Sequence, residues 1–451
     1  MLYSIVSGMS TTQFIPSEAD FMSLFNQLIS PTDRRKLAKA YRRSKAGAPP
    51  KLKDIELMAG LVFHVCQPSG VLSEHIRHLT NKHFSDSSLS ERRQTMDWPL
   101  WVALMSHACG PLAQEKQHPG AFYKGLRLIG IDGTTWNVAN TPPIKKKVRK
   151  TTSRRKAAAF HRLSGAVLYE LGLHNPITAR FGLDGEAELA LAAQLWPLLQ
   201  KDWLLIADRY YGVGKVVGIL SRLDSKPAFL LRIRKNLKVA IIEVLPDGSA
   251  LIEVIDSQAG EKILLREIRA RVRRRSGQWV SIRLWTNLLD CKTYPARELV
   301  QLYAMRWEQE IAFKELKIDI KRDSLLLSHT LCTATQEVAA LLMAQALIVR
   351  ARLATADFGR VPVLCISFVR TLQAFRAVWM TFAIIEDLLP KRIRRIFVHR
   401  VLEILVAQQS PPRRPRSCPR AVRQPIHKWP RLLKNTSSSG DFSYKVVRIN
   451  P

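Results

Sequence analysis

The chain has 451 residues, and 70 Lys and Arg against 37 Asp and Glu give it a formal charge of +33. This excess excludes an ordinary acidic enzyme and favours nucleic acid as the partner, because each phosphate that a cation neutralises releases bound counterions. With 47% apolar residues the chain can bury a large core, so its length predicts two to three folded domains rather than a disordered polymer.

The sequence favours a cytoplasmic protein that is not bound to a membrane. The longest mostly apolar run, residues 338–349, is too short to span a bilayer. The first residues lack the basic region and cleavage site of a signal peptide, and Met9 is an alternative start to Met1. The cysteines lack the close spacing of metal clusters, so reduced thiols are predicted. They are Cys66, Cys109, Cys291, Cys332, Cys365 and Cys418.

Residues 1–125 are predicted to form a helical N-terminal domain that binds DNA. Apolar residues recur at helical spacing in residues 21–29 and 55–65. Between these segments lie the basic residues Arg34, Arg35, Lys36, Lys39, Arg42, Arg43 and Lys45. Such helices can lie across a DNA backbone, although a solvated face on an ordinary helical domain explains each basic cluster about as well.

A mixed sheet is predicted from residue 126 onward. The predicted strands are residues 128–133, 163–173, 177–183, 203–207 and 228–233, and the predicted helices are residues 186–199 and 213–223. The strand at 203–207 is apolar throughout, which is typical of a central strand covered on both faces. Three strands in hairpin order, then helix, strand, helix and strand, match an α/β fold with a ribonuclease H-like core, a mixed five-stranded sheet with helices.

A β-rich insertion is predicted to interrupt this core, which comprises residues 126–234 and 291–353. Period-2 alternation and turn residues predict two hairpins within residues 235–290, outside the core sheet. Further helices are predicted at residues 294–320, 335–353 and 367–388. Residues 354–390 are predicted as a C-terminal helical region, and residues 391–451 as a basic, partly disordered tail.

One of these predicted helices gathers four polar side chains. On a regular helix Tyr303, Arg306, Glu310 and Lys317 fall within an arc of about 60°. A pattern that only stabilises a helix has no reason to align a Tyr, an Arg and a distant Lys with one acid. Taken alone, a purely structural role for this stripe is about equally probable.

Two aspartates are predicted to meet this helix. Asp132 and Asp208 end apolar strands that should be neighbours, so their carboxylates would converge at one edge, where Glu310 can supply a third. Three carboxylates without His or Cys favour two Mg²⁺ ions, with Mn²⁺ as a substitute, and such a pair supports in-line phosphoryl displacement. For each aspartate alone, a role as a cap or turn residue is more common.

The spaced signature resembles that of the bacterial DDE transposases of the insertion sequence 4 family, which include the transposase of transposon five. The resemblance rests on Tyr303, Arg306, Glu310 and Lys317, and on residues 131–135 and 207–209, which are similar to the two aspartate strands of that family. Membership would make Asp132, Asp208 and Glu310 the catalytic residues and the metal ligands.

The same resemblance implies a set of residues that contact DNA. They are Tyr303, Arg306, Trp307, Lys317 and Arg209. Arg306 and Lys317 carry the charges suited to phosphates, and Trp307 suits stacking on a base, with Trp279 and Trp285 as alternatives on the insertion. Arg209 either binds phosphate or only balances the acidic cluster. The basic run at residues 145–156 is a further candidate for DNA contact, with a solvated loop as its alternative.

The resulting hypothesis is a DNA transposase that cleaves the ends of a mobile element and transfers the freed 3′ hydroxyl to target DNA. Its expected partners are double-stranded DNA, both terminal inverted repeats and target, and a second copy of the chain in a synapse. One alternative is a ribonuclease H-like nuclease that cuts without joining. Another is a DNA-binding protein whose catalytic core is inactive.

Overall fold

The computed structural model describes residues 21–28, 32, 35, 51–96, 98–147, 159–183, 187–234, 237, 239–256, 258–273, 277–322, 325–385, 388–412 and 444–447. Most of the basic residues at 34–45, and the tail from 413 to 443, lie outside these ranges. The chain forms two compact units. Unit 1 comprises residues 1–120, 133–192 and 311–411, and unit 2 comprises residues 121–132, 193–310 and 412–451.

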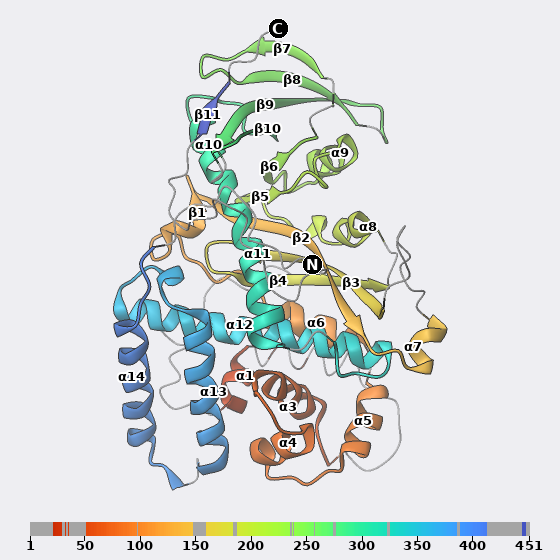
Figure 1. Cartoon of the computed structure of the whole chain (residues 1–451), viewed down its shortest axis with the longest axis vertical. Helices are drawn as coiled ribbons and strands as arrows, with labels where there is room; N and C mark the ends of the chain where they lie inside the picture. The colour runs from red at the N-terminus through yellow and green to blue at the C-terminus, as the bar shows by residue number, and fades with distance from the viewer. Residues whose placement is uncertain are drawn as a thin grey trace. The chain divides into compact units, whose positions relative to one another are not determined.

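Unit 1 is organised around one long helix, α12 (Leu331–Gly359), which Figure 1 shows beside the N-terminal helices. Those helices are α1 (Phe21–Gln27), α3 (Asp54–Cys66), α4 (Leu72–Thr80), α5 (Asp86–Gln94) and α6 (Trp98–Ala108). α12 contacts α3 and α6, and also α13 (Phe368–Ile385) and α14 (Lys391–Ala407). Because its sequence is apolar on all sides, α12 forms the core of this unit.

Two helices of unit 1 are long and apolar enough to cross a membrane by length and composition alone. They are α12 and α13, with mean hydropathies of 1.5 and 1.2. The predicted run at 338–349 is thus part of a longer helix. The most apolar 18-residue stretch of α12 is 94% buried inside the structure, which is typical of a core helix.

Helix α14 was not expected, because residues 391–407 were predicted to belong to an extended basic tail. Its buried side chains include Val398, Leu402 and Leu405, which recur at helical spacing on one face. The tail was predicted from its high content of Arg and Pro, and composition does not reveal the spacing of these apolar residues. The boundaries of the five predicted domains remain predictions.

The strand β2 (Leu126–Val138) begins in unit 2 and ends in unit 1. In unit 1 the strand order is β4-β3-β2, where β3 (His161–Glu170) and β4 (Asn175–Leu183) form an antiparallel hairpin. The short helix α7 (Pro142–Lys147) follows β2. These strands agree closely with the three strands predicted in hairpin order, although β2 runs further than predicted.

In unit 2 the strand order is β2-β5-β6-β10-β9-β8-β7. The parallel strands are β2, β5 (Trp203–Ala207) and β6 (Ala228–Arg232), and α9 (Gly214–Arg222) connects β5 to β6. The insertion strands are β7 (Ala240–Val244), β8 (Ala250–Ile255), β9 (Lys262–Arg273) and β10 (Trp279–Thr286). β1 (Phe122–Tyr123) pairs with β2 and β11 (Tyr444–Val446) pairs with β9.

The insertion was predicted to lie outside the core sheet, and that prediction is wrong. β10 pairs antiparallel with β6, with Leu284 opposite Arg232 and Thr286 opposite Leu230. The insertion strands therefore extend the sheet of unit 2. The physical reason is that β6 would otherwise present an open row of N–H and C=O groups, which the neighbouring strand satisfies.

Two predicted helices are broken into shorter segments. Residues 294–320 form α10 (Ala296–Leu302), the 3₁₀ turn η4 (Tyr303–Met305), α11 (Arg306–Lys314) and the π-helical segment η5 (Glu315–Ile320). Residues 186–199 form α8 (Glu188–Ala193) and the 3₁₀ turn η3 (Trp196–Leu198), because Pro197 removes a helical N–H donor. The regular stripe from Tyr303 to Lys317 therefore does not exist as predicted.

The described cysteines are free thiols, as predicted: Cys66, Cys109, Cys291, Cys332 and Cys365. Burial raises the pKa of both Cys66 and Cys109 to about 12, so neither supplies a reactive thiolate near neutral pH. Cys418 lies outside the described residues.

A histidine pair between α3 and α4 predicts acid sensitivity in unit 1. The two Nδ1 atoms of His64 and His75 lie 2.8 Å apart. Burial and then the neighbouring His75 lower the pKa of His64 to about 4, below its ordinary value. At His64 the folded chain thus binds fewer protons than the unfolded chain. The contribution of His64 to the free energy of unfolding is therefore fully present above about pH 6.5 and is lost as the pH drops towards 4.

Denaturant unfolding at about pH 7 and about pH 5 tests this prediction. Below about pH 6.5, protonation of His64 should lower the free energy of unfolding by about 1.4 kcal/mol for each pH unit. In His64→Asn the slope between these pH values should become shallower. An unchanged slope in that variant would assign the acid sensitivity to other groups.

Candidate functional site

Both predicted aspartates lie where two parallel strands of unit 2 stop pairing. Gly130 of β2 is opposite Ile206 of β5, and Asp132 and Asp208 each follow two residues later. Asp132 was predicted to end its strand, and that prediction is wrong, because β2 continues to Val138. Since parallel neighbours advance in the same direction, the two carboxylates emerge at the same level of the sheet.

A tight turn after β5 fixes Asp208. Its Oδ1 accepts a hydrogen bond of 2.7 Å from the backbone N–H of Tyr210, and its carbonyl accepts one of 3.2 Å from Tyr211. A surface pocket of about 410 Å³ opens at this turn and is lined by Asp208, Arg209, Tyr210 and Arg234. Two of the four lining residues are arginines, so the pocket suits an anionic group.

Glu310 is held by an arginine one helical turn before it. Arg306 Nη2 donates to Glu310 Oε1 over 2.9 Å, and the two side chains are 12% and 42% exposed. The Arg306 guanidinium also lies 4.3 Å from the ring centroid of Trp307. The first turn of α11 therefore presents a partly buried cation that contacts both a carboxylate and an aromatic face.

Tyr303 lies close to the predicted acids. Burial raises the pKa of its hydroxyl, and the charges of Asp208 and Asp132 raise it further. Arg306 and Arg232 act in the opposite direction on the same hydroxyl. Within the described part of the chain, the buried Tyr303 oxygen makes no hydrogen bond. A phenol in this state stays protonated and is available as a donor.

The electrostatics of Arg306 connect the same residues. Burial alone would lower the pKa of its guanidinium, but Tyr303, Glu310 and Asp132 together raise it above its ordinary value. Pairwise electrostatic interactions thus link Tyr303 and Arg306 to Asp132, Asp208 and Glu310 within unit 2.

Metal-binding geometry is a separate matter. Across the ranges that the structure describes, no three His, Cys, Asp or Glu side chains lie close enough to hold a metal ion. Glu310 is paired with Arg306 instead. A metal site built from Asp132, Asp208 and Glu310 would require Glu310 to exchange this partner, while the oxygen-only donor set itself suits Mg²⁺ or Mn²⁺.

Lys317 belongs to unit 1, whereas Tyr303, Arg306 and Glu310 belong to unit 2. Its Nζ donates to the Thr135 carbonyl over 2.7 Å and lies 5.2 Å from the Trp136 ring centroid. Its ammonium therefore contacts the final residues of β2, and it does not lie on the regular helix that the spacing suggested.

Some residues beside the site were missed in the sequence. Arg232 ends β6 and interacts with Tyr303, while Tyr210 and Arg234 line the pocket beside Asp208. The usable signal was the placement of Arg232 and Arg234 at the end of the strand that follows β5. The ends of neighbouring parallel strands meet at one edge of a sheet, so basic residues there belong with Asp132 and Asp208.

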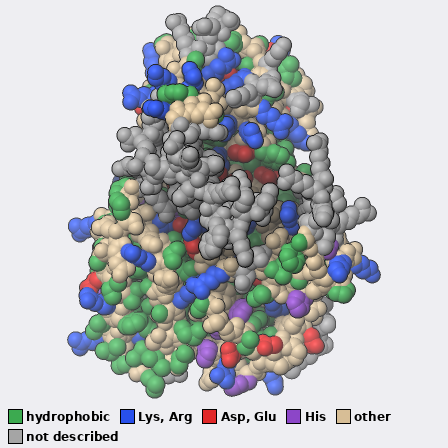
Figure 2. Space-filling view, in the orientation of Figure 1, with side chains coloured by type: hydrophobic (Ala, Val, Ile, Leu, Met, Phe, Trp, Pro, Cys, Tyr) green, Lys and Arg blue, Asp and Glu red, His purple; other side chains and the backbone are tan. Residues whose placement is uncertain are grey.

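Basic side chains are not confined to this group. Figure 2 shows Lys and Arg scattered over the visible face. Of the basic run predicted at residues 145–156, the structure describes Lys145, Lys146 and Lys147, which are exposed at the end of α7. The rest of that run lies outside the described residues.

Comparisons with known proteins indicate the family of the chain. A family model described as Transposase DDE domain matches residues 123–347. The chain is 27% identical over 213 residues to transposase InsG for insertion sequence element IS4 of Escherichia coli (strain K12), covering 46% of this chain and 48% of that protein. The chain thus spans about half the length of the curated relative that it matches.

Among solved structures, the chain is similar to the piggyBac transposase synaptic complex with hairpin DNA. The TM-score is 0.41 at 9% sequence identity, and the match covers 88% of this chain and 84% of the other.

Proposed function

Because the chain belongs to the DDE-domain transposases of the insertion sequence 4 type, we propose that it cuts DNA at the ends of a mobile element and joins those ends to a target. The observation that carries this proposal is the coupled group of Asp132, Asp208 and Glu310 with Tyr303 and Arg306. Acids alone suit many hydrolases, whereas acids beside a buried cation and a phenol donor suit a phosphate backbone.

A ribonuclease H-like core is the finer form of the fold proposal. It is supported by the order β4-β3-β2 in unit 1 and β2-β5-β6 in unit 2. β3 and β4 pair antiparallel, and β5 pairs parallel with both β2 and β6. The element order of hairpin strands, then strand, α9 and strand, is the one that the sequence predicted.

We propose that Asp132, Asp208 and Glu310 hold two divalent ions, Mg²⁺ with Mn²⁺ as a substitute. All three side chains are at least partly exposed, and hard cations prefer carboxylate oxygens. When bound, such ions polarise phosphate and make water a better nucleophile. In this scheme the phosphate of the DNA draws Arg306 away from Glu310, which frees the third carboxylate.

The remaining side chains would position the nucleic acid. Arg306 suits bidentate contact with a phosphate, and the Tyr303 hydroxyl can donate to a phosphate oxygen. Arg209, exposed beside Asp208, extends the cationic surface at the pocket. Trp307 can stack on a base once Arg306 moves, a contact worth about 1–3 kcal/mol.

The proposed partners are double-stranded DNA, namely terminal inverted repeats and target, and a second copy of the chain that brings two ends together. The net charge of +33 supports a polyanionic partner. A bacterial cytoplasmic location, in association with the nucleoid, is proposed with them.

A strand-joining assay tests the proposed activity. Precut duplexes that carry the terminal inverted repeat of the encoding element are incubated with the full chain, Mg²⁺ and supercoiled plasmid. Covalent joining of the labelled end to the plasmid is expected, and a duplex with a scrambled repeat is the matched control. Hydrolysis without any joined product would favour a nuclease, and DNA binding without either reaction would indicate an inactive core.

A further inference from the structure

The turn that carries Lys317 is irregular and is fixed by interior contacts. η5 (Glu315–Ile320) is π-helical, with the Lys321 N–H donating to the Leu316 carbonyl five residues earlier. π-helical turns are rare and occur mostly as single turns, often at functional sites, because they admit one extra residue. Without external restraints, the segment would be expected to return to a regular α-helix.

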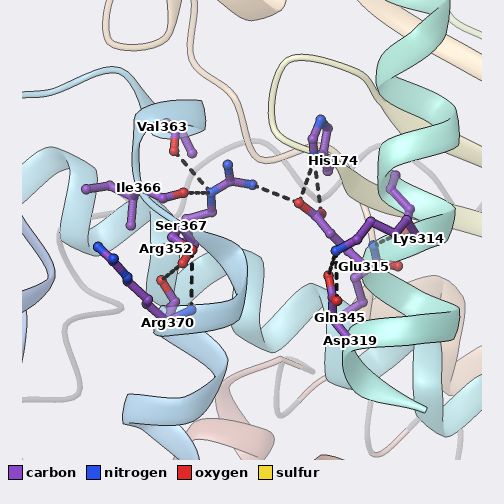
Figure 3. A network of polar contacts seen from close by, with 12 residues as sticks. His174, Lys314, Glu315, Asp319, Gln345, Arg352, Val363, Ile366, Ser367 and Arg370 are labelled. Carbon is purple, nitrogen blue, oxygen red and sulfur yellow. Dashed lines mark hydrogen bonds and ion pairs between the residues drawn. The ribbon is translucent and has the colours of Figure 1, made fainter. Parts of the chain in front are cut away.

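Figure 3 shows the contacts that hold this turn from the inside. Both carboxylate oxygens of Glu315 lie 3.0 Å from Nδ1 of His174, and Nη1 of Arg352 lies 3.7 Å from Oε1. The three side chains are at most 3% exposed. A carboxylate buried to this degree requires such partners, so its location is strongly fixed.

Both partners of Glu315 are themselves fixed. Arg352 of α12 donates through Nε to the carbonyls of Val363 and Ile366, over 3.1 and 2.8 Å. His174 lies between β3 and β4 with a φ of 59°, a left-handed conformation that is uncommon outside glycine. Such a backbone persists only where its surroundings determine it.

Two more contacts support the same turn. Gln345 of α12 donates to the carbonyl of Ala312 over 3.0 Å, which supplies a donor from outside the helix just before the π-helical segment. At the surface, Lys314 pairs with both oxygens of Asp319, at 2.8 and 2.6 Å, across five residues. That spacing brings side chains together on a π-helical turn.

We infer that Glu315 is a positioning residue for Lys317, and this inference rests on the proposed function, in which Lys317 contacts DNA as the family resemblance implies. On a regular helix each residue advances by about 100°, so losing the extra residue of the turn would swing Lys317 away from Trp136 and the Thr135 carbonyl. The buried carboxylate thereby determines where the Lys317 ammonium is presented.

The geometric test follows the indole N–H resonance of Trp136 in the ¹⁵N-labelled full chain, identified with Trp136→Phe. Lys317→Ala gives the shift expected when the ammonium leaves the ring. Glu315→Gln should move the resonance in the same direction, and in the Lys317→Ala background it should cause no further change. Glu315→Asp, which keeps the charge and folds more readily, should produce an intermediate shift.

Two results would overturn the inference. The first is a Trp136 resonance that stays at its wild-type position in Glu315→Gln, or in Glu315→Asp if the first variant does not fold. The second is a shift of the same size with and without Lys317. Glu337→Gln is the matched control, because Glu337 is also buried and holds the amides of Leu327 and Ser328.

DNA affinity separates this inference from the proposed function. For the terminal-repeat duplex, Glu315→Gln should weaken binding roughly three- to tenfold and reduce the salt slope by about one, as Lys317→Ala does. If the Trp136 resonance moves but neither variant alters DNA affinity, the positioning of Lys317 stands and its proposed contact with DNA fails.

Discussion

Asp132→Asn, Asp208→Asn and Glu310→Gln should each reduce strand cleavage at least about a thousandfold, which corresponds to ~4 kcal/mol of activation free energy. The size of the effect follows from the proposed role of each carboxylate as a ligand of the divalent ions. Each substitution removes a charge that the proposed divalent ions require while preserving the shape of the side chain. Single-turnover cleavage of a labelled terminal-repeat duplex measures the loss.

Binding and folding controls make this result specific. DNA affinity should fall little in the three variants, because neutralising an acid does not weaken attraction to phosphates. Asp202→Asn is the matched substitution, since Asp202 precedes the same strand β5 at its other end and is exposed. Near-normal cleavage in any of the three site variants would remove that residue from the catalytic group.

Arg266→Met should lower the free energy of unfolding of unit 2 by about 3–5 kcal/mol. Arg266 is fully buried, forms an ion pair with Asp247 and donates to Ser249 Oγ over 2.7 Å. It also donates to the carbonyls of Leu288 and Tyr294. Removing it leaves several buried acceptors without their donor, and methionine fills only part of its volume.

The loss should extend to the helices that bear the site. Asp247 Oδ2 also accepts from the N–H of Ala296, the first residue of α10, which leads to Tyr303 and Arg306. Urea denaturation followed by circular dichroism measures the change. Arg271→Met, at an exposed position of the same strand, is the control and should change stability little. Equal losses in the two variants would contradict a special role for the buried arginine.

The sequence predicted best those elements whose burial is uniform. Strand β5 was predicted with its observed bounds because every residue from Trp203 to Ala207 is apolar and buried. The two aspartates were selected because each directly follows an apolar run in the sequence, although Asp132 lies within β2 and not after it. The spacing of Tyr303, Arg306 and Glu310 predicted that this part of the chain would meet the aspartates, and both Tyr303 and Arg306 interact electrostatically with Asp132. Lys317, which the same spacing included, belongs to the other unit.

The failures share one cause, which is contact between residues distant in sequence. No local pattern near Glu315 reveals the π-helical turn, because its partners are His174 and Arg352. Likewise, the pairing of β10 with β6 depends on which strand edges meet in space. Arg232 and Arg234 were not predicted as site residues, because their place beside Asp208 depends on the pairing of their strand with β5.

The pairing of β11 with β9 has a practical consequence for shortened forms of the protein. Tyr444 lies opposite Val272 and Val446 opposite Ala270, so residues from the last part of the chain complete one flank of the insertion strands. A truncated product that ended before Tyr444 would leave the main-chain groups at this end of β9 uncovered. Uncovered strand edges recruit other chains, so deleting the tail invites aggregation as well as loss of charge.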